Sequence, residues 1–293
     1  MRFTAFRLPR LAVGLSLGLF SASVLSAQTP INTLADTVAQ VEQRLGARVG
    51  VSLVDTGSEL SWFYREDERF LMNSAVKVPI CGAVLARMDA GALSLTDTLP
   101  VREAEILSYA PVTEQQIGAE MSLGDLCLAA LDMSDNTAAN MLLDHIGGPQ
   151  AVTAFFREID DETSRLDRRE PELNTFAPGD PRDTTTPAAM TDTLRRLLLG
   201  DALSPGARAQ LADWMSIGGV TGALLRDDAP GGWRFLDKSG SGSHTRNIIG
   251  VVIPEGRAPW IVTIFISDVA ADFESRNAAL QQIGSAVMAV IRN

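Results

Sequence analysis

Strand-like segments at both ends of the chain, with a helical block between them, most constrain how these 293 residues can fold. Near the N-terminus, residues 48–55 and 59–65 alternate or run apolar around a Thr-Gly-Ser turn, which is a hairpin pattern. Near the C-terminus, three further segments are rich in Val, Ile and aromatic residues: 233–238, 245–253 and 260–267. The pattern therefore predicts one antiparallel sheet of about five strands, built from both ends of the chain.

Helical periodicity predicts what surrounds this sheet. Residues 31–45 place apolar side chains at helical spacing, and residues 273–291 form an amphipathic helix at the other end. Six helical segments are expected in between, at 76–90, 123–131, 137–146, 150–159, 187–199 and 205–214. The expected fold class is α/β (α+β), with terminal helices flanking the sheet and an inserted all-α domain. The predicted domains are 28–71 with 215–293 for the α/β part, and 72–214 for the all-α part, which includes an irregular loop at 163–183.

Residues 1–27 have the composition of a secretory signal peptide. Three arginines come first, an apolar core follows at 11–20, and small residues lead up to Ala27. Cleavage after Ser26 and cleavage after Ala27 both fit. The apolar run is too short for a stable membrane span. We therefore expect a periplasmic or secreted protein whose mature form has no membrane anchor.

Charge and the scarce residue types exclude several functions. The formal net charge of -11 argues against a nucleic-acid partner, which would require a basic patch. The two histidines, His145 and His244, have no partner at metal-ligand spacing, so we expect no metal site and no cofactor. The two cysteines, Cys81 and Cys127, could form a disulfide in an oxidising compartment or be two buried thiols, and composition favours neither.

Asn73-Ser74-Ala75-Val76-Lys77 places a hydroxyl and an amine three residues apart at the start of a predicted helix. Side chains at this spacing share one helix face. A serine becomes a nucleophile when a neighbouring base takes its proton, and a lysine kept neutral by burial can do so. An ordinary helix start with a solvated lysine is the alternative for this short pattern.

Three further motifs add polar groups in a fixed order. Ser134-Asp135-Asn136 lies between two helical segments, where it could face a cleft or simply cap a helix. Lys238-Ser239-Gly240-Ser241-Gly242 ends a predicted strand, where it could bind a carboxylate or form a glycine-rich turn. In the irregular loop, Glu170 with Asn174 four residues later could hold and activate a water molecule, or could belong to an exposed acidic loop.

All four motifs together, in this order and in a chain of this size, resemble those of the class A serine β-lactamases. The resemblance extends over the whole mature chain. It includes TEM-type and carbenicillinase-type features at residues 133–140, 146–149, 165–168 and 182–185. It implies the fold shared by serine β-lactamases and penicillin-binding proteins, and a monomer that acts on small β-lactam antibiotics.

The resemblance also implies roles for individual residues. Ser74 would attack the β-lactam carbonyl, and Lys77 would act as the acylation base or as the partner of Glu170. Ser134 would pass a proton to the leaving nitrogen. Glu170 and Asn174 would hold and activate the deacylating water. The backbone N–H groups of Ser74 and Ser241 would form the oxyanion hole. The substrate-binding residues would be Tyr109 at the entrance, Asn136 at the side-chain amide, and Lys238, Ser239, Gly240, Ser241 and Arg246 along the strands.

Other implications concern pairs of residues and departures from the family pattern. Cys81 and Cys127 match a pair that is disulfide-bonded in TEM-like members. Arg246 is the candidate for a carboxylate-binding arginine, although the connection before it is one residue shorter than in those members. Residue 169 is an arginine where a bulky apolar residue is common in the family. Asn73 and Gly242 occupy positions where some carbapenem-hydrolysing members carry a cysteine pair.

The expected activity is hydrolysis of penicillins, and of some cephalosporins, through a serine acyl-enzyme that confers β-lactam resistance. The alternatives are a penicillin-binding D-Ala-D-Ala peptidase, which lacks a water-activating glutamate, and a β-lactam sensor that stays acylated. The presence of Glu170 favours hydrolysis over a peptidase. A sensor usually carries a membrane-spanning segment, and the pattern predicts none after the signal peptide. The sequence does not fix the substrate range, because discrimination among cephalosporins can depend on about one or two kcal/mol.

Overall fold

The computed structural model describes residues 19–227 and 229–293. Residues 1–18, and with them most of the predicted signal peptide, lie outside the described residues. Residues 19–27 belong to the first helix, α1 (Leu19–Leu45). Within the described part of the chain, no helix has both the length and the hydropathy needed to cross a membrane.

A five-stranded antiparallel sheet forms the centre of the fold, as the sequence predicts. Its strand order is β2-β1-β9-β8-β7, so strands from the two ends of the chain lie side by side. Val51 of β1 pairs with Ile264 of β9, which joins the N-terminal and C-terminal halves of the sheet. The bounds are β1 (Arg48–Asp55), β2 (Ser61–Tyr64), β7 (Arg234–Ser241), β8 (Arg246–Ile253) and β9 (Trp260–Ser267).

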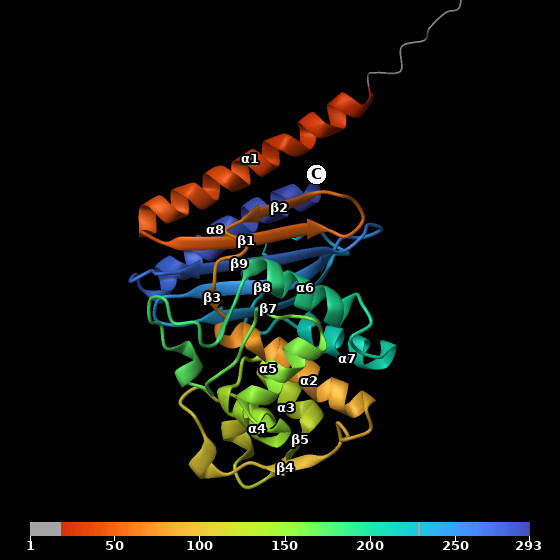
Figure 1. The fold of residues 1–293 in the computed structure, drawn as a ribbon, viewed down its shortest axis with the longest axis vertical. Helices are drawn as coiled ribbons and strands as arrows, with labels where there is room; N and C mark the ends of the chain where they lie inside the picture. The colour runs from red at the N-terminus through yellow and green to blue at the C-terminus, as the bar shows by residue number, and fades with distance from the viewer. Residues whose placement is uncertain (1–18, 228) are drawn as a thin grey trace, which may run out of the picture.

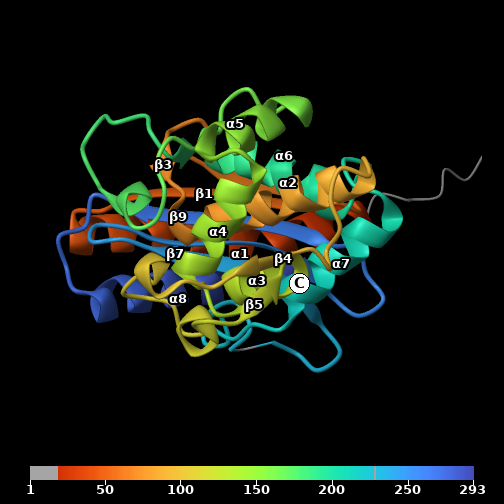
Figure 2. The same ribbon diagram turned by 90° about the horizontal axis from the view of Figure 1, so that it is seen from below.

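Helices cover both faces of this sheet. The terminal helices α1 and α8 (Phe273–Arg292) pack against each other on one face, and the other helices lie on the opposite face (Figure 1). Seen from below, the helical block covers the sheet (Figure 2). Two apolar cores result because each face buries the inward side chains of alternate strand residues. Leu34 and Ile264 belong to the core under α1 and α8, whereas Ile80 and Phe265 belong to the core of the helical block.

The six helices of the block confirm the sequence prediction, with small shifts at their ends. They are α2 (Lys77–Asp89), α3 (Leu123–Asp132), α4 (Asn136–Ile146), α5 (Pro149–Glu158), α6 (Pro187–Leu198) and α7 (Pro205–Ser216). Ser122 caps α3, because its side chain accepts the N–H of Asp125 at 3.0 Å. The domain boundaries inferred from the sequence stay a prediction.

Short elements complete the block. Two pairs of short strands lie outside the main sheet: β3 (Phe70–Leu71) pairs with β6 (Thr184–Thr185), and β4 (Thr98–Pro100) pairs with β5 (Glu120–Ser122). Four single turns of 3₁₀ helix are η1 (Asn73–Val76), η2 (Glu103–Glu105), η3 (Thr113–Gln116) and η4 (Glu172–Asn174). The β3–β6 pair ties the chain just before η1 to the chain just after the irregular loop.

The disulfide expected between Cys81 and Cys127 is not present in this structure. Both residues are buried free thiols, on α2 and α3 respectively. The sulfur of Cys81 lies 3.8 Å from the backbone carbonyl oxygen of Cys127, so the packing of the two helices directs it toward the backbone. Burial raises the pKa of the Cys127 thiol well above its ordinary value.

Candidate active site

Ser74 lies in the turn η1, directly before α2, and a network around Asn73 holds that turn in place. Asn73 has a φ of 48°, in the left-handed region, which asparagine tolerates better than most residues. Its side-chain nitrogen donates to Asn174 Oδ1 at 2.9 Å. Its side-chain oxygen accepts from Thr245 Oγ1 at 2.7 Å and from Asn247 Nδ2 at 3.0 Å. The residue before the candidate nucleophile is therefore fixed from three sides.

Lys77 is fully buried and lies at the centre of the polar cluster. Its Nζ donates to Ser74 Oγ at 3.0 Å, to the Ser134 carbonyl oxygen at 2.8 Å and to Asn136 Oδ1 at 2.6 Å. Glu170 Oε1 lies 3.1 Å from the same nitrogen. Burial lowers the pKa of Lys77, while the carboxylate of Glu170 opposes part of that effect. A lysine with a lowered pKa, in contact with a serine hydroxyl, can take its proton.

Ser134 connects this lysine to a second buried lysine. Its hydroxyl lies 3.4 Å from Lys77 Nζ and accepts a hydrogen bond from Lys238 Nζ at 3.0 Å. Burial, followed by repulsion from Lys77 and Arg246, holds the pKa of Lys238 well below its ordinary value. Ser134 itself has a φ of 59°, in the left-handed region. The Ser134 hydroxyl can therefore relay a proton between the cluster and a bound group.

Asp135, for which the sequence predicted no role, joins the start of α4 to the segment at residues 112–113. The side chain is completely buried and accepts the N–H of Ala138, which caps α4. It also accepts the backbone N–H groups of Val112 at 3.0 Å and Thr113 at 2.9 Å. Next to it, the N–H of Asn136 donates to the carbonyl oxygen of Tyr109 at 3.0 Å. These bonds fix the segment that carries Tyr109 at the cleft.

Glu170 enters the cluster from the irregular loop. Its peptide bond to Pro171 is cis. The side chain is buried, and Oε2 accepts from Asn174 Nδ2 at 2.6 Å. Oε1 has Lys77 as its ion-pair partner but accepts no hydrogen bond of good geometry among the described residues. A carboxylate oxygen in this position can accept a proton from a water molecule beside Ser74.

The loop that carries Glu170 is ordered by an internal ion pair. Arg168 and Asp183 contact each other through Nε and Oδ2, and Asp183 Oδ1 also accepts the backbone N–H groups of Asp167 and Arg168, both at 2.8 Å. The N–H of Asp183 in turn donates to Asp167 at 3.0 Å. The two ends of the loop are therefore joined, and Glu170 is buried and not part of an exposed acidic loop.

Strand β7 passes close to Ser74 because Gly240 has no side chain. A Cβ at Gly240 would lie 2.7 Å from the Met72 carbonyl oxygen and 3.2 Å from the backbone nitrogen of Ser74. At Gly242 a Cβ would lie 2.9 Å from Asn73 Nδ2, so these two positions are neighbours in space. The close approach brings the end of β7, and with it Ser241, beside the N-terminal turn of α2.

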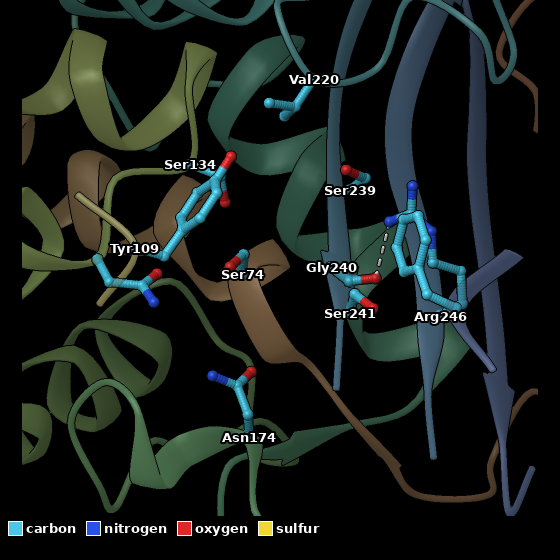
Figure 3. Close-up of a pocket in the computed structure, with 11 residues that line it drawn as sticks. Ser74, Tyr109, Ser134, Asn174, Val220, Ser239, Gly240, Ser241 and Arg246 are labelled. Carbon is cyan, nitrogen blue, oxygen red and sulfur yellow. Dashed lines mark hydrogen bonds between the residues drawn. The ribbon is translucent and has the colours of Figure 1, made fainter. Parts of the chain in front are cut away.

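The motifs meet around a cavity of about 440 Å³. Figure 3 shows Ser74 between Ser134 and Tyr109 on one side and the strand residues Ser239, Gly240 and Ser241 on the other, with Asn174 below. Nine of the predicted catalytic and substrate-binding residues line this cavity, and the buried Lys77, Glu170 and Lys238 contact them through hydrogen bonds. Two further residues line the cavity, Val220 and Phe273, and neither belongs to a motif that would mark it in the sequence.

Arg246 lies at the strand side of this cavity (Figure 3). It is the first residue of β8 and pairs with Ser241 of β7. Its guanidinium donates to the Gly240 carbonyl oxygen at 3.1 Å and to Asn277 Oδ1 at 2.9 and 3.0 Å. Burial and the nearby Arg276 lower the pKa of Arg246 to about 10, so the group stays cationic at neutral pH. The shorter connection before Arg246 therefore still delivers the cation to the cleft.

The chemistry of the cluster is that of a serine nucleophile with protein bases. Within residues 19–227 and 229–293, no group of three or more His, Cys, Asp or Glu side chains is arranged to hold a metal ion. Ser74, two lysines, a glutamate and a cationic strand edge converge on one cavity. Such a site can acylate a serine and supply a water molecule to remove the acyl group.

Comparisons with known proteins agree with this geometry. A sequence profile described as the Beta-lactamase enzyme family matches residues 32–291. A β-lactamase of Rhodobacter capsulatus is 64% identical over the full length of both chains. β-Lactamase L2 of Stenotrophomonas maltophilia is 44% identical over 97% of this chain and 96% of its own.

Solved structures give the class. An ancestral class A β-lactamase superposes with a TM-score of 0.84 at 48% identity, covering 87% of this chain and 99% of its own. A β-lactamase from Xanthomonas campestris superposes with a TM-score of 0.86 at 43% identity, covering 89% and 98%. The chain therefore belongs to the beta-lactamase enzyme family and is a class A β-lactamase.

Proposed function

We propose that the enzyme hydrolyses the β-lactam ring of penicillins, and of some cephalosporins, through an acyl-enzyme on Ser74. The observation that carries the proposal is the position of Glu170. Its carboxylate is buried within ion-pair distance of Lys77 and accepts from Asn174, next to the serine. A peptidase or a sensor that acylates the same serine has no use for a carboxylate in that place.

In the acylation half, Ser74 Oγ bonds to the lactam carbonyl carbon while its proton passes to the neutral amine of Lys77, directly or by way of Glu170. The N–H groups of Ser74 and Ser241 would stabilise the oxyanion that develops on the carbonyl oxygen. As the C–N bond of the ring breaks, Ser134 gives its proton to the leaving nitrogen. The lysines on either side of Ser134 can return that proton.

In the deacylation half, Glu170 takes a proton from a water molecule that it holds together with Asn174. The resulting hydroxide adds to the ester carbon, and the bond to Ser74 Oγ breaks with return of a proton to the serine. Arg246, Lys238 and Ser239 supply the charge and hydroxyl for the substrate carboxylate. Asn136 and Tyr109 are left to bind the acylamino side chain.

We also propose export and a monomeric mature enzyme. The signal-like composition of residues 1–27 supports export to the periplasm or the medium. N-terminal sequencing of the exported protein tests this, with Ala27 or Gln28 expected as the first residue. Gel filtration of the mature protein tests the monomer.

The test of the proposed reaction uses purified mature enzyme with benzylpenicillin and a chromogenic cephalosporin, in the presence of EDTA. We expect turnover that survives the chelator. By intact-protein mass spectrometry, Glu170→Ala should accumulate a penicilloyl adduct, and Ser74→Ala should form none. A wild-type enzyme that acylates once and stops would overturn hydrolysis, and an adduct on Ser74→Ala would refute the choice of nucleophile.

A further inference from the structure

One face of α4 touches the catalytic cluster and its loop at three successive turns. Asn136, Asn140 and Asp144 are spaced by four residues, so their side chains lie in a row. Asn136 accepts from Lys77 at 2.6 Å. Asn140 holds the backbone of Glu170 twice, accepting its N–H at 3.0 Å and donating to its carbonyl oxygen at 2.8 Å. Two of the three positions thus fix catalytic groups.

The third position, Asp144, pairs with the residue directly before Glu170. Asp144 Oδ1 accepts from Arg169 Nε at 2.8 Å and lies 2.6 Å from another nitrogen of the same guanidinium. The backbone of Arg169 also takes part, because its carbonyl oxygen accepts the N–H of Leu173 at 2.8 Å. That bond closes the turn between Glu170 and Asn174.

The charge of Asp144 does not stabilise α4 on its own. Asp144 lies in the last turn of the helix, where the helix dipole disfavours an acid. The guanidinium of Arg169 lies beside the C-terminal end of the helix, since a Cβ at Gly148 would be 3.4 Å from it. A cation from the loop is favourable there, and it offsets the unfavourable acid. The arrangement therefore joins the loop to the helix at some cost to the helix alone.

We infer that Arg169, paired with Asp144, is a positioning residue that holds the loop carrying Glu170 and thereby sets the rate of deacylation. The inference rests on the proposed acyl-enzyme reaction. It addresses the residue at which this chain departs from the apolar side chain common in the family. The pair acts through the backbone of Glu170 and touches neither substrate nor water.

The expected effect is small, because the Arg169 and Asp144 side chains are 47% and 62% exposed. An exposed ion pair contributes enough for a rate change of about two- to fivefold, and salt weakens it. Both contacts reach the same carboxylate oxygen, so a single ammonium group could replace the guanidinium. Arg169→Lys should therefore retain most of the effect that Arg169→Gln loses.

The experiment measures acylation and deacylation separately with benzylpenicillin, by rapid quench and intact-protein mass spectrometry, at low and at high salt. Arg169→Gln and Asp144→Asn should each slow deacylation about two- to fivefold at low salt, leave acylation unchanged, and converge on the wild type at high salt. The double variant should be no slower than either single one. Asp144→Asn should not lower the melting temperature, because it removes an acid from a helix C-terminus.

Arg234→Gln is the matched control. Arg234 pairs with Asp213 at 2.8 Å, with side chains 47% and 70% exposed, and lies far along β7 from the Ser74 end. It should change neither step. Unchanged deacylation in both Arg169→Gln and Asp144→Asn, or an equal fall in both steps, would overturn the inference. Failure of the wild type to acylate would instead refute the proposed function, so the two failures are distinguishable.

Discussion

At the scale of single residues, the most unusual feature of the site is that two lysines are buried in one cluster. Lys77 and Lys238 are both fully buried, and both contact the hydroxyl of Ser134. Burial lowers the pKa of each, and a charge on Lys77 would lower the pKa of Lys238 further. Only Lys77 has a carboxylate, Glu170, at ion-pair distance. The site therefore stores unfavourable charge that serves binding and proton transfer at the expense of stability.

Lys238→Met should make the enzyme more stable at neutral pH while impairing penicillin binding. The pKa of Lys238 is lower in the folded than in the unfolded chain, so the unfolded chain binds more protons and wild-type stability rises with pH through that window. Replacing a buried charge by an apolar side chain of similar volume can stabilise by about 1–4 kcal/mol. The advantage of Lys238→Met should therefore shrink as the pH rises toward the ordinary lysine pKa.

Urea unfolding at several pH values, from neutral to alkaline, measures this difference. The control is Arg234→Gln, which removes a solvent-exposed arginine. Its stability relative to wild type should not depend on pH. A Lys238→Met enzyme that is less stable than wild type at neutral pH, with the same pH slope, would contradict the argument.

At the scale of elements, the first turns of α8 complete the proposed carboxylate subsite on β7 and β8. Arg246 extends from β8, and α8 holds it from two sides. Asn277 accepts two of its N–H groups, and the ring of Phe273 lies 5.3 Å from the guanidinium carbon. Phe273 and Asn277 are four residues apart and so share one helix face. The position of Arg246 therefore depends on a helix that is distant from the motifs in sequence.

Arg246→Ala should raise the KM for penicillins about tenfold or more, since a hydrogen bond to a charged group contributes about 1.5–3 kcal/mol. Asn277→Leu keeps the cation but removes its neutral partner, so its effect on KM should be smaller. Steady-state kinetics with benzylpenicillin measure both. An unchanged KM in Arg246→Ala would mean that Lys238 and Ser239 bind the carboxylate without it.

The sequence predicts elements and local motifs well, because their signals lie within a few residues of one another. The sheet built from both chain ends follows from strand composition, and the six helices follow from periodicity. Ser74 with Lys77, and Glu170 with Asn174, are short-range pairs that the fold brings together. The approach of β7 to Ser74 could be expected from Gly240, because a glycine in a strand often marks close backbone contact.

Contacts between elements that are distant in sequence could not be predicted in this way. Phe273 and Asn277 read as ordinary residues of an amphipathic helix until α8 is placed beside β8. The partner of Arg169 depends on how the loop lies against α4. The sequence therefore identified Arg169 as a departure from the family pattern but did not predict what it contacts. The disulfide prediction was wrong for the same reason. The family resemblance identified the two cysteines but not the direction of the Cys81 sulfur.

At the scale of the whole molecule, the sheet separates two apolar cores, and only the core of the helical block includes a residue of the turn between Glu170 and Asn174. The core under α1 and α8 includes Leu280, whereas the core of the helical block includes Leu173, which lies between Glu170 and Asn174 in the loop. Each of these leucines is 1% exposed. The same substitution, leucine to alanine, can therefore be made in the core on either side of the sheet.

Leu280→Ala and Leu173→Ala should both lower the free energy of unfolding by about 2–5 kcal/mol, since each removes the same buried atoms and leaves a cavity. Only Leu173→Ala should slow deacylation, because Leu173 lies between Glu170 and Asn174, the residues proposed to hold the water. Urea unfolding measures stability, and mass spectrometry during turnover measures the acylated fraction, which should rise in Leu173→Ala alone. An equal rise in Leu280→Ala would mean that the sheet transmits packing changes to the site and that the two cores are not functionally separate.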